Sequence, residues 1–119
     1  MKAVFGSDIL IDYLQGLEQA RKEISLYSEK CISMVSWMEV MCGAGDAEDE
    51  AKCRGFLARF ETVDIGFEVA GKAVEIRREH RIKLPDAIVW ATALQEGCLL
   101  VTRNTKDFPH NHPGVRVPY

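Results

Sequence analysis

The sequence has few features that would place it in a specialised class of protein. No apolar stretch reaches the roughly 18 residues that a membrane-spanning helix needs, and Asp8 and Asp12 interrupt the only candidate for a secretory signal. The four cysteines include no C-x-x-C pair, which argues against structural zinc, although their even number leaves disulfides open. Repeats and low-complexity segments are also lacking. We therefore expect a cytoplasmic protein in a reducing compartment, with no membrane partner.

The chain also has no excess of basic residues. The formal net charge is -3, so the surface as a whole is not built for nucleic acid, and any such site has to be a local patch. The 119 residues suffice for one hydrophobic core, and 47% hydrophobic with 28% charged residues is an ordinary globular composition. We expect one folded domain spanning residues 1–119.

Short apolar runs that suit strands alternate along the chain with helical periods. The expected strands are 3–5, 31–35, 62–65, 98–102 and 114–117, and the expected helices are 9–14, 17–28, 37–42, 46–60, 67–77 and 85–96. This alternation predicts an α/β fold with a parallel sheet covered by helices on both faces. Such sheets form their binding crevice at the carboxyl ends of the strands.

Two local features follow from the same pattern. Ser36 is placed to cap the helix after the second strand. The spacing of Phe67, Ala70, Val74 and Arg77 predicts a later helix that runs up to the basic residues at 77–83.

Four acidic residues stand where expected strands end or the following helices begin. In chain order they are Asp8, Glu39, Asp86 and Asp107. Carboxylates that converge repel one another unless they share a cation, and their oxygen atoms suit Mg²⁺ or Mn²⁺. Such a metal activates water and stabilises charge on a phosphoryl group, so phosphodiester cleavage is the natural use of this cluster.

Each acid also has a plain structural explanation. Ser7 or Asp8 is the expected N-cap of the first helix, Asp86 would face the helix dipole favourably, and Asp107 suits a polar turn. Glu39 is harder to explain in this way, because its segment is apolar and an unpaired carboxylate is costly to bury. Spacing alone leaves both interpretations open.

Four blocks of sequence follow one another along nearly the whole chain. They read DILIDYL at residues 8–14, ISMVSWMEVMCGA at 32–44, LPDAIVWATA at 84–93 and LVTRNTKDF at 100–108. In this order and spacing they resemble the blocks of PIN-domain toxins of the VapC type. Any single block is a weak signal, whereas the four together are specific.

The resemblance implies a PIN-like three-layer α/β fold, in which helices flank a central, mostly parallel sheet of about five short strands. It implies a metal-dependent endoribonuclease that leaves a 3′-hydroxyl and a 5′-phosphate, with Mg²⁺ or Mn²⁺ as the cofactor. It also implies RNA as substrate, a homodimer, and a cognate antitoxin protein as the partner.

Site residues carry over only where the motifs match. Glu39, Asp86 and Asp107 match positions that hold the metal or the attacking water, and Asp8 is a further candidate metal ligand. The candidate substrate contacts are Ser7, Asn104, Arg103 and Lys106.

One position departs from the family pattern. Gly6 stands where the first metal-binding Asp belongs, and it has no carboxylate. It is either a turn glycine with positive φ, an inactivating substitution that was engineered or selected, or the mark of a naturally degenerate copy. A lost ligand weakens a hard-cation site, so we expect little or no activity. Asp8 begins a helix, which argues against its replacing that ligand.

Two functions follow from the sequence. The preferred one is a metal-dependent endoribonuclease toxin of a type II toxin-antitoxin system, weakened or inactivated at residue 6. The alternative is a non-catalytic PIN-fold module that binds antitoxin or RNA. The basic run at 77–83 is interpreted mainly as a solvated helix end, with a lesser claim to the RNA backbone. His110 and His112 are interpreted as loop residues rather than metal ligands.

Overall fold

Five parallel strands form the central sheet of the computed structural model, which describes residues 1–109 and 111–119. The strands, in the order β3-β2-β1-β4-β5, are β1 (Lys2–Phe5), β2 (Glu29–Ser33), β3 (Glu61–Val63), β4 (Leu99–Val101) and β5 (Val115–Arg116). The helices are α1 (Ser7–Leu14), α2 (Glu18–Ser25), α3 (Met34–Cys42), α4 (Ala47–Leu57), α5 (Phe67–His80) and α6 (Leu84–Gln95). The predicted α/β fold is confirmed, and every strand pairing in it is parallel.

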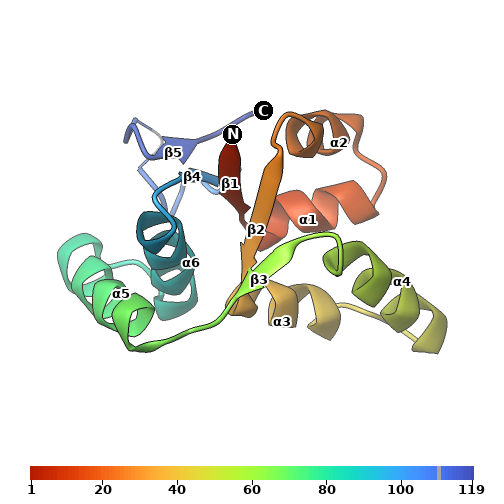
Figure 1. The fold of residues 1–119 in the computed structure, drawn as a ribbon, viewed down its shortest axis with the longest axis horizontal. Helices are drawn as coiled ribbons and strands as arrows, with labels where there is room; N and C mark the ends of the chain where they lie inside the picture. The colour runs from red at the N-terminus through yellow and green to blue at the C-terminus, as the bar shows by residue number, and fades with distance from the viewer. Residues whose placement is uncertain (110) are drawn as a thin grey trace.

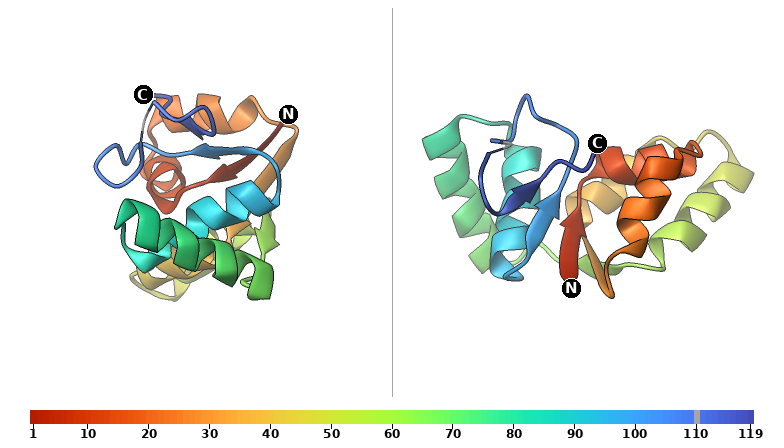
Figure 2. Two further views of the ribbon diagram at one scale, coloured as in Figure 1. Left: turned by 90° about the vertical axis from the view of Figure 1, so that its left-hand side faces the viewer. Right: turned by 90° about the horizontal axis from the view of Figure 1, so that it is seen from above.

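Helices cover both faces of the sheet and give the structure three layers (Figure 1). α5 and α6 lie on one face, and α1 to α4 lie on the other (Figure 2). Successive residues of β1 point to opposite layers: Val4 packs with the α5 and α6 side, whereas Ala3 and Phe5 pack with the α1 side. Each inner strand is therefore buried on both faces, as a continuous apolar run predicts.

The strand order places a crevice beside β1. From β1 the chain builds β2 and β3 on one side, and it then returns to the other side of β1 with β4. Parallel sheets bind their ligands at such a reversal, at the carboxyl ends of the strands. The strand arrows in the right panel of Figure 2 point toward this edge, which faces away from the viewer in Figure 1.

Helix α3 begins earlier than the sequence pattern predicts. The Ser33 hydroxyl accepts a hydrogen bond from the Val35 N–H at 3.2 Å, so Ser33 caps the helix and the prediction of Ser36 as the cap is wrong. Met34 and Val35 are helical, although their apolar and β-branched character had suggested a longer strand. The Ser36 hydroxyl is buried and has no hydrogen-bond partner among the described residues.

The predicted helix is present as α5, and its buried face is not the set of residues whose spacing predicted it. Val69, Ala73 and Ile76 are buried, whereas Phe67 is 98% exposed and Val74 is exposed too. Both sets of residues have helical spacing, so the period alone could not select between them. The buried set faces α6, the helix against which α5 packs.

The start of α1 differs from the prediction as well. Ser7 is the first helical residue and Gly6 occupies the N-cap position, where no side chain makes a capping hydrogen bond. Neither Ser7 nor Asp8 caps the helix. Elsewhere the element boundaries shift by a few residues, as in α2, which ends at Ser25.

The cysteines are thiols, and no disulfide joins them in the described part of the chain. Burial raises the pKa of the Cys31 thiol to about 11. In the same ranges, no helix combines the length and the apolar character that crossing a membrane requires.

Candidate metal centre at the carboxyl edge of the sheet

A cavity of about 370 Å³ lies at the carboxyl edge of the sheet, next to the ends of β1 and β4. Its walls come from the start of α1, from α3 and α6, and from the segment that follows β4. The predicted site residues in these walls are Gly6, Ser7, Asp8, Glu39, Asp86, Arg103, Asn104 and Lys106. Residues from four distant parts of the sequence therefore meet at this edge.

Asp86 is the carboxylate most strongly affected by its surroundings. It is half-buried in the first turn of α6. Burial, together with the negative charges of Asp107 and Glu39, raises the pKa of Asp86 to about 6. Lys83 acts in the opposite direction. Three predicted site residues thus lie close enough to repel one another.

Glu39 and Asp107 reach this region from different elements. Glu39 is exposed on α3, so the cost of burial that made it conspicuous in the sequence does not arise. Asp107 is held by Asn104, whose Nδ2 donates to Asp107 Oδ2 at 2.8 Å and whose Oδ1 accepts from the Asp107 N–H at 3.2 Å. Within the described residues, no three His, Cys, Asp or Glu side chains are close enough to bind one ion. The acids share a region without surrounding a single point.

The Asp8 side chain turns back toward the end of β4. Its Oδ2 accepts hydrogen bonds from the Thr102 hydroxyl at 3.0 Å and from the Arg103 N–H at 2.9 Å, and its Oδ1 accepts from the Ile9 N–H at 2.8 Å. Although Asp8 belongs to a helix, its carboxylate therefore lies in the cavity wall at the strand ends.

Gly6 adopts a conformation that any residue could adopt. Its φ of -68° and ψ of 158° are extended, so the explanation of a turn glycine with positive φ is wrong. A Cβ at this position would lie 2.8 Å from Asp8 Oδ1 and 3.4 Å from Thr102 Oγ1. The Asp8 carboxylate thus occupies space that a side chain at residue 6 would need, and it is the movable end of a flexible side chain.

The guanidinium of Arg103 is already engaged by a carboxylate. Its Nε donates to Asp12 Oδ2 at 2.7 Å and its Nη2 donates to Asp12 Oδ1 at 3.0 Å. A contact between Arg103 and substrate phosphate would have to compete with this bidentate pair.

The basic run at 77–83 and His112, two further candidates from the sequence, lie outside the cavity walls. In the basic run, Arg77 donates to the Ile82 carbonyl, and only Lys83 influences a cavity acid. His112 Nδ1 accepts from the Gly114 N–H at 2.9 Å, whereas His110 lies outside the described residues.

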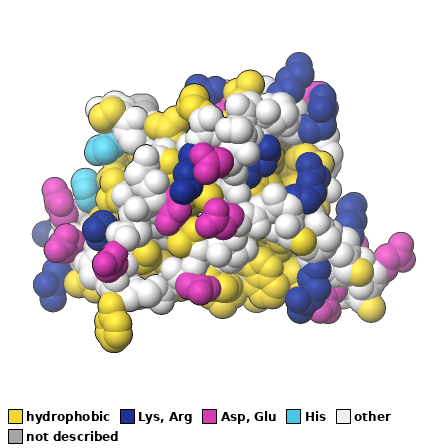
Figure 3. All heavy atoms as spheres, viewed as in Figure 1, with side chains coloured by type: hydrophobic (Ala, Val, Ile, Leu, Met, Phe, Trp, Pro, Cys, Tyr) yellow, Lys and Arg dark blue, Asp and Glu magenta, His cyan; other side chains and the backbone are white. Residues whose placement is uncertain are grey.

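On the opposite face, at the amino ends of the strands, Lys and Arg are scattered among Asp and Glu (Figure 3).

Comparison with known proteins decides the family. The family model described as the PIN domain matches residues 7–111, which is most of the chain. The chain belongs to the PIN-domain family. The resemblance seen in the four sequence blocks is thereby confirmed.

Solved structures similar to this PIN domain come from toxin-antitoxin complexes. A chain of a toxin-antitoxin complex from Klebsiella pneumoniae is 40% identical with a TM-score of 0.93, covering 99% of this chain and 98% of that chain. A chain of DNA-bound VapBC from Salmonella typhimurium is 25% identical with a TM-score of 0.79, covering 98% and 96%. VapBC2 from Rickettsia felis, 21% identical with a TM-score of 0.78 and covering 97% and 96%, supports the fold alone. A search of curated proteins gave no significant match.

The donor set of this PIN domain fits a divalent cation in kind. Carboxylate oxygens are the ligands that Mg²⁺ and Mn²⁺ prefer, and a cation beside Asp86 would relieve the repulsion that raises its pKa. The set is incomplete in number, because Gly6 supplies no oxygen and the neighbouring acids among the described residues do not surround one ion position.

Sequence reasoning missed some residues of this PIN domain. Thr102 is fully buried, donates to Asp8, and accepts from the Asn104 N–H at 3.1 Å. Its place at the end of a buried strand, next to a polar turn, was a usable signal. Asp12 and Tyr119 were also missed, and the sequence offered no signal that they meet.

Proposed function

We propose that this PIN domain is the toxin of a type II toxin-antitoxin pair, a Mg²⁺- or Mn²⁺-dependent endoribonuclease that is weakened by Gly6. One observation carries the proposal: Glu39 and Asp86 line the cavity at the carboxyl edge of the sheet, and Asp107 lies near enough that, with burial and Glu39, it raises the pKa of Asp86 to about 6. The 40% identity to a chain of a toxin-antitoxin complex supports it.

The protein's own residues have distinct tasks in this proposal. Asp86, Glu39 and Asp107 would hold the cation, and Asn104 keeps Asp107 oriented through two hydrogen bonds. Since the pKa of Asp86 is about 6, its carboxyl is mostly ionised at neutral pH and available as a ligand. When bound, a divalent cation supplies charge stabilisation for the phosphoryl group and lowers the pKa of a coordinated water.

Gly6 explains why we expect weak activity. A carboxylate at residue 6 would stand between the ends of β1 and β4, close to Thr102. Without it, the nearest carboxylate is that of Asp8, which three hydrogen bonds hold in the wall. Mg²⁺ demands regular geometry, so a site that lacks one ligand binds it poorly.

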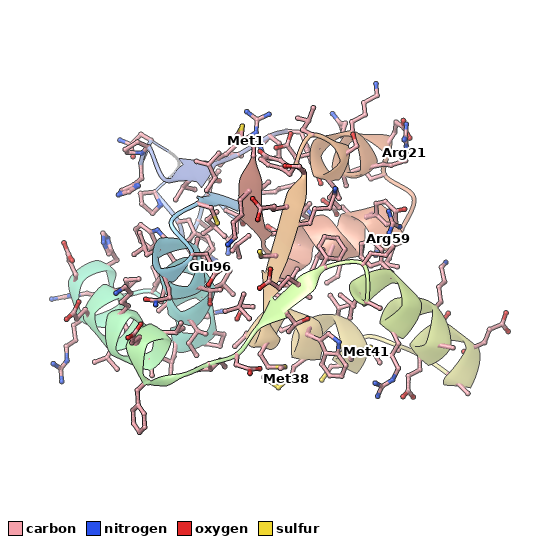
Figure 4. The ribbon with its side chains drawn as sticks, in the orientation of Figure 1. Met1, Arg21, Met38, Met41, Arg59 and Glu96 are labelled. Carbon is pink, nitrogen blue, oxygen red and sulfur yellow. The ribbon has the colours of Figure 1, made fainter. Side chains whose placement is uncertain are left out.

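The partners we propose are RNA, an antitoxin and a second copy of the chain, all in the cytoplasm. Apolar side chains remain exposed for protein contacts: Met38 of α3 is 45% exposed and Phe67 of α5 is 98% exposed. Figure 4 shows Met38 and Met41 at the lower margin of the view, on α3, and Figure 3 shows apolar surface gathered along that margin. Contiguous apolar surface of this kind is typical of protein contact sites.

Restoring the carboxylate tests the proposal. We expect Gly6→Asp to gain Mn²⁺- or Mg²⁺-dependent cleavage of RNA, whereas Gly6→Asn, which has nearly the same shape without the charge, stays inert. Because the new side chain would meet Asp8, the double variant Gly6→Asp with Asp8→Ser gives it room. Gel analysis of RNA fragments with and without chelator is the measurement.

The alternative is a non-catalytic module that binds antitoxin or RNA. It is favoured by the absence of a carboxylate at residue 6 and by the described acids not surrounding one point. If Gly6→Asp and its double variant are as inert as Gly6→Asn, the nuclease proposal is wrong and the module is adopted.

A further inference from the structure

Two buried carboxylates lie outside the cavity and take no part in the proposed reaction. Asp12 of α1 is 7% exposed, and Glu23 of α2 is 4% exposed. Buried carboxylates are costly unless they are paired and hydrogen-bonded. Each of these two is paired with one arginine and one tyrosine; the arginines are Arg103, in the turn after β4, and Arg116, in β5.

The first group, the Asp12 triad, consists of Asp12, Arg103 and Tyr119. Arg103 donates to both carboxylate oxygens of Asp12, at 2.7 and 3.0 Å. The Tyr119 hydroxyl donates to Asp12 Oδ2 at 2.7 Å, and the Tyr119 ring packs against the core on the α1 side. The triad thus connects α1, the turn after β4, and the residues after β5.

The second group, the Glu23 triad, consists of Glu23, Arg116 and Tyr27. Arg116 donates to the two oxygens of Glu23 at 2.6 and 2.9 Å, and the Tyr27 hydroxyl donates to Glu23 Oε2 at 2.8 Å. It repeats the chemistry of the Asp12 triad at a different place. Neither Glu23 nor Arg116 lines the cavity.

Only the Asp12 triad connects to the cavity. The backbone N–H of Arg103 donates to Asp8 Oδ2 at 2.9 Å, while the side chain of the same residue is fixed by Asp12. The next residue, Asn104, donates its N–H to Thr102 Oγ1 and its amide group to Asp107. The guanidinium therefore anchors a turn whose other groups set the positions of Asp8, which lines the cavity, and of Asp107, which lies beside the cavity residue Asp86.

We propose that Asp12, Arg103 and Tyr119 are positioning residues, which hold the turn after β4 and thereby keep Asp8 in the cavity wall and Asp107 beside Asp86. Arg103 thereby acts through its neighbours, and its guanidinium is not a phosphate ligand. Side chains that hydrogen-bond to the residues around a ligand hold those residues within fractions of an ångström of the positions that binding requires. The inference rests on the proposed function only in taking the cavity as the catalytic site.

The test compares Tyr119→Phe with Tyr27→Phe, two changes that each remove one hydroxyl from a carboxylate. Amide hydrogen exchange of the N–H groups of Arg103, Asn104 and Asp107 reports the order of the turn. We expect exchange to be about fivefold faster in Tyr119→Phe, the factor that corresponds to one lost hydrogen bond. In Tyr27→Phe these amides should change no more than the Ala87 N–H of α6, the internal reference for general loosening.

The outcomes are distinct. If the three turn amides respond equally to both substitutions, the positioning role is wrong and the triad only stabilises the fold. A second measurement is Mn²⁺ affinity by electron paramagnetic resonance in the Gly6→Asp background, where we expect Tyr119→Phe to weaken binding about fivefold and Tyr27→Phe to leave it unchanged. If Gly6→Asp binds no Mn²⁺ and cuts no RNA, the proposed function fails, while the exchange data still decide the role of the triad.

Discussion

Asp86 occupies a position that disfavours its charged form. Its pKa is raised from the usual 3.8 to about 6 by burial and by neighbouring acids. Below the unfolded value the carboxyl is protonated in both the folded and the unfolded chain, and this position costs nothing. As pH rises from 3.8 to 6, the unfolded chain ionises this carboxyl before the folded protein does, so the free energy of unfolding falls, and above 6 the loss is complete.

Asp86→Asn should therefore stabilise the metal-free protein near neutral pH. After allowance for solvent screening of a half-buried group, we expect a gain of about 1 kcal/mol, which disappears toward pH 3. Urea unfolding at a series of pH values measures it, with Glu75→Gln on the exposed surface of α5 as the control. A gain that persists unchanged in acid would mean that the charge of Asp86 is not its cause.

For single residues, the sequence predicted which side chains form the site but not how those side chains are oriented. The blocks around Glu39, Asp86 and Asp107 located the acids before the structure was known. The placement of Asp8 depends on Thr102, 94 residues away, and on the Arg103 N–H. Nothing near Asp8 in the sequence shows that these donors draw its carboxylate back over Gly6.

Helix α5 presents its apolar residues on two sides. Ile76 is 7% exposed in the core, whereas Phe67 is 98% exposed at the first position of the helix. Ile76→Ala should lower the free energy of unfolding by about 2–5 kcal/mol. Phe67→Ala should change it by less than about 0.5 kcal/mol, because it removes no buried contact.

Urea unfolding of the two variants at low protein concentration checks this contrast. A large loss in Phe67→Ala would contradict the structure's assignment of the buried face. A loss that grows with protein concentration would instead place Phe67 in a contact between copies of the chain.

Element types were predictable because each segment carries its own apolar period, but boundaries were not. In α3, a strand-like apolar sequence continues into the helix, and only the hydrogen bond from the Val35 N–H to Ser33 reveals where the helix starts. Caps depend on side-chain geometry, and two serines with similar surroundings in the sequence offered the same signal.

At the scale of the whole molecule, α1 and α2 are joined to the last part of the chain by hydrogen bonds from Arg103, from Arg116 of β5 and from Tyr119. Arg116, and then Tyr27, hold the pKa of the buried Glu23 carboxyl below its usual 4.5. A lowered pKa contributes stability that is present above the usual value and is lost as pH falls through the folded value.

Glu23→Gln should lower the free energy of unfolding by about 1–2 kcal/mol near neutral pH, since the buried amide loses the charge-assisted hydrogen bonds from Arg116 and Tyr27, while the half-exposed Arg116 remains solvated. The difference from the unmodified protein should shrink as pH falls below 4.5. Glu18→Gln removes an exposed pair with Arg21 on the same helix and should have little measurable effect. If the two substitutions lower the free energy of unfolding equally, the pair of Glu23 with Arg116 contributes no more stability than an exposed pair, which would contradict this prediction.

The overall architecture was largely predictable, because alternating strands and helices of this length permit few folds other than a covered parallel sheet. The strand order was not, since it depends on pairings between distant segments such as Val4 with Leu100. Local patterns contain no information about which strand lies next to β1.

The pairing of β1 with β4 has a consequence for timing during synthesis. The ribosome makes β1 to β3 and helices α1 to α6 first, and those parts can begin to fold before β4 and its turn exist. One wall of the cavity, with Thr102, Arg103 and Asn104, comes only from these last-made residues. An unfinished chain therefore has no complete cleft, and under the proposed function it is harmless to the RNA of the ribosome that is producing it.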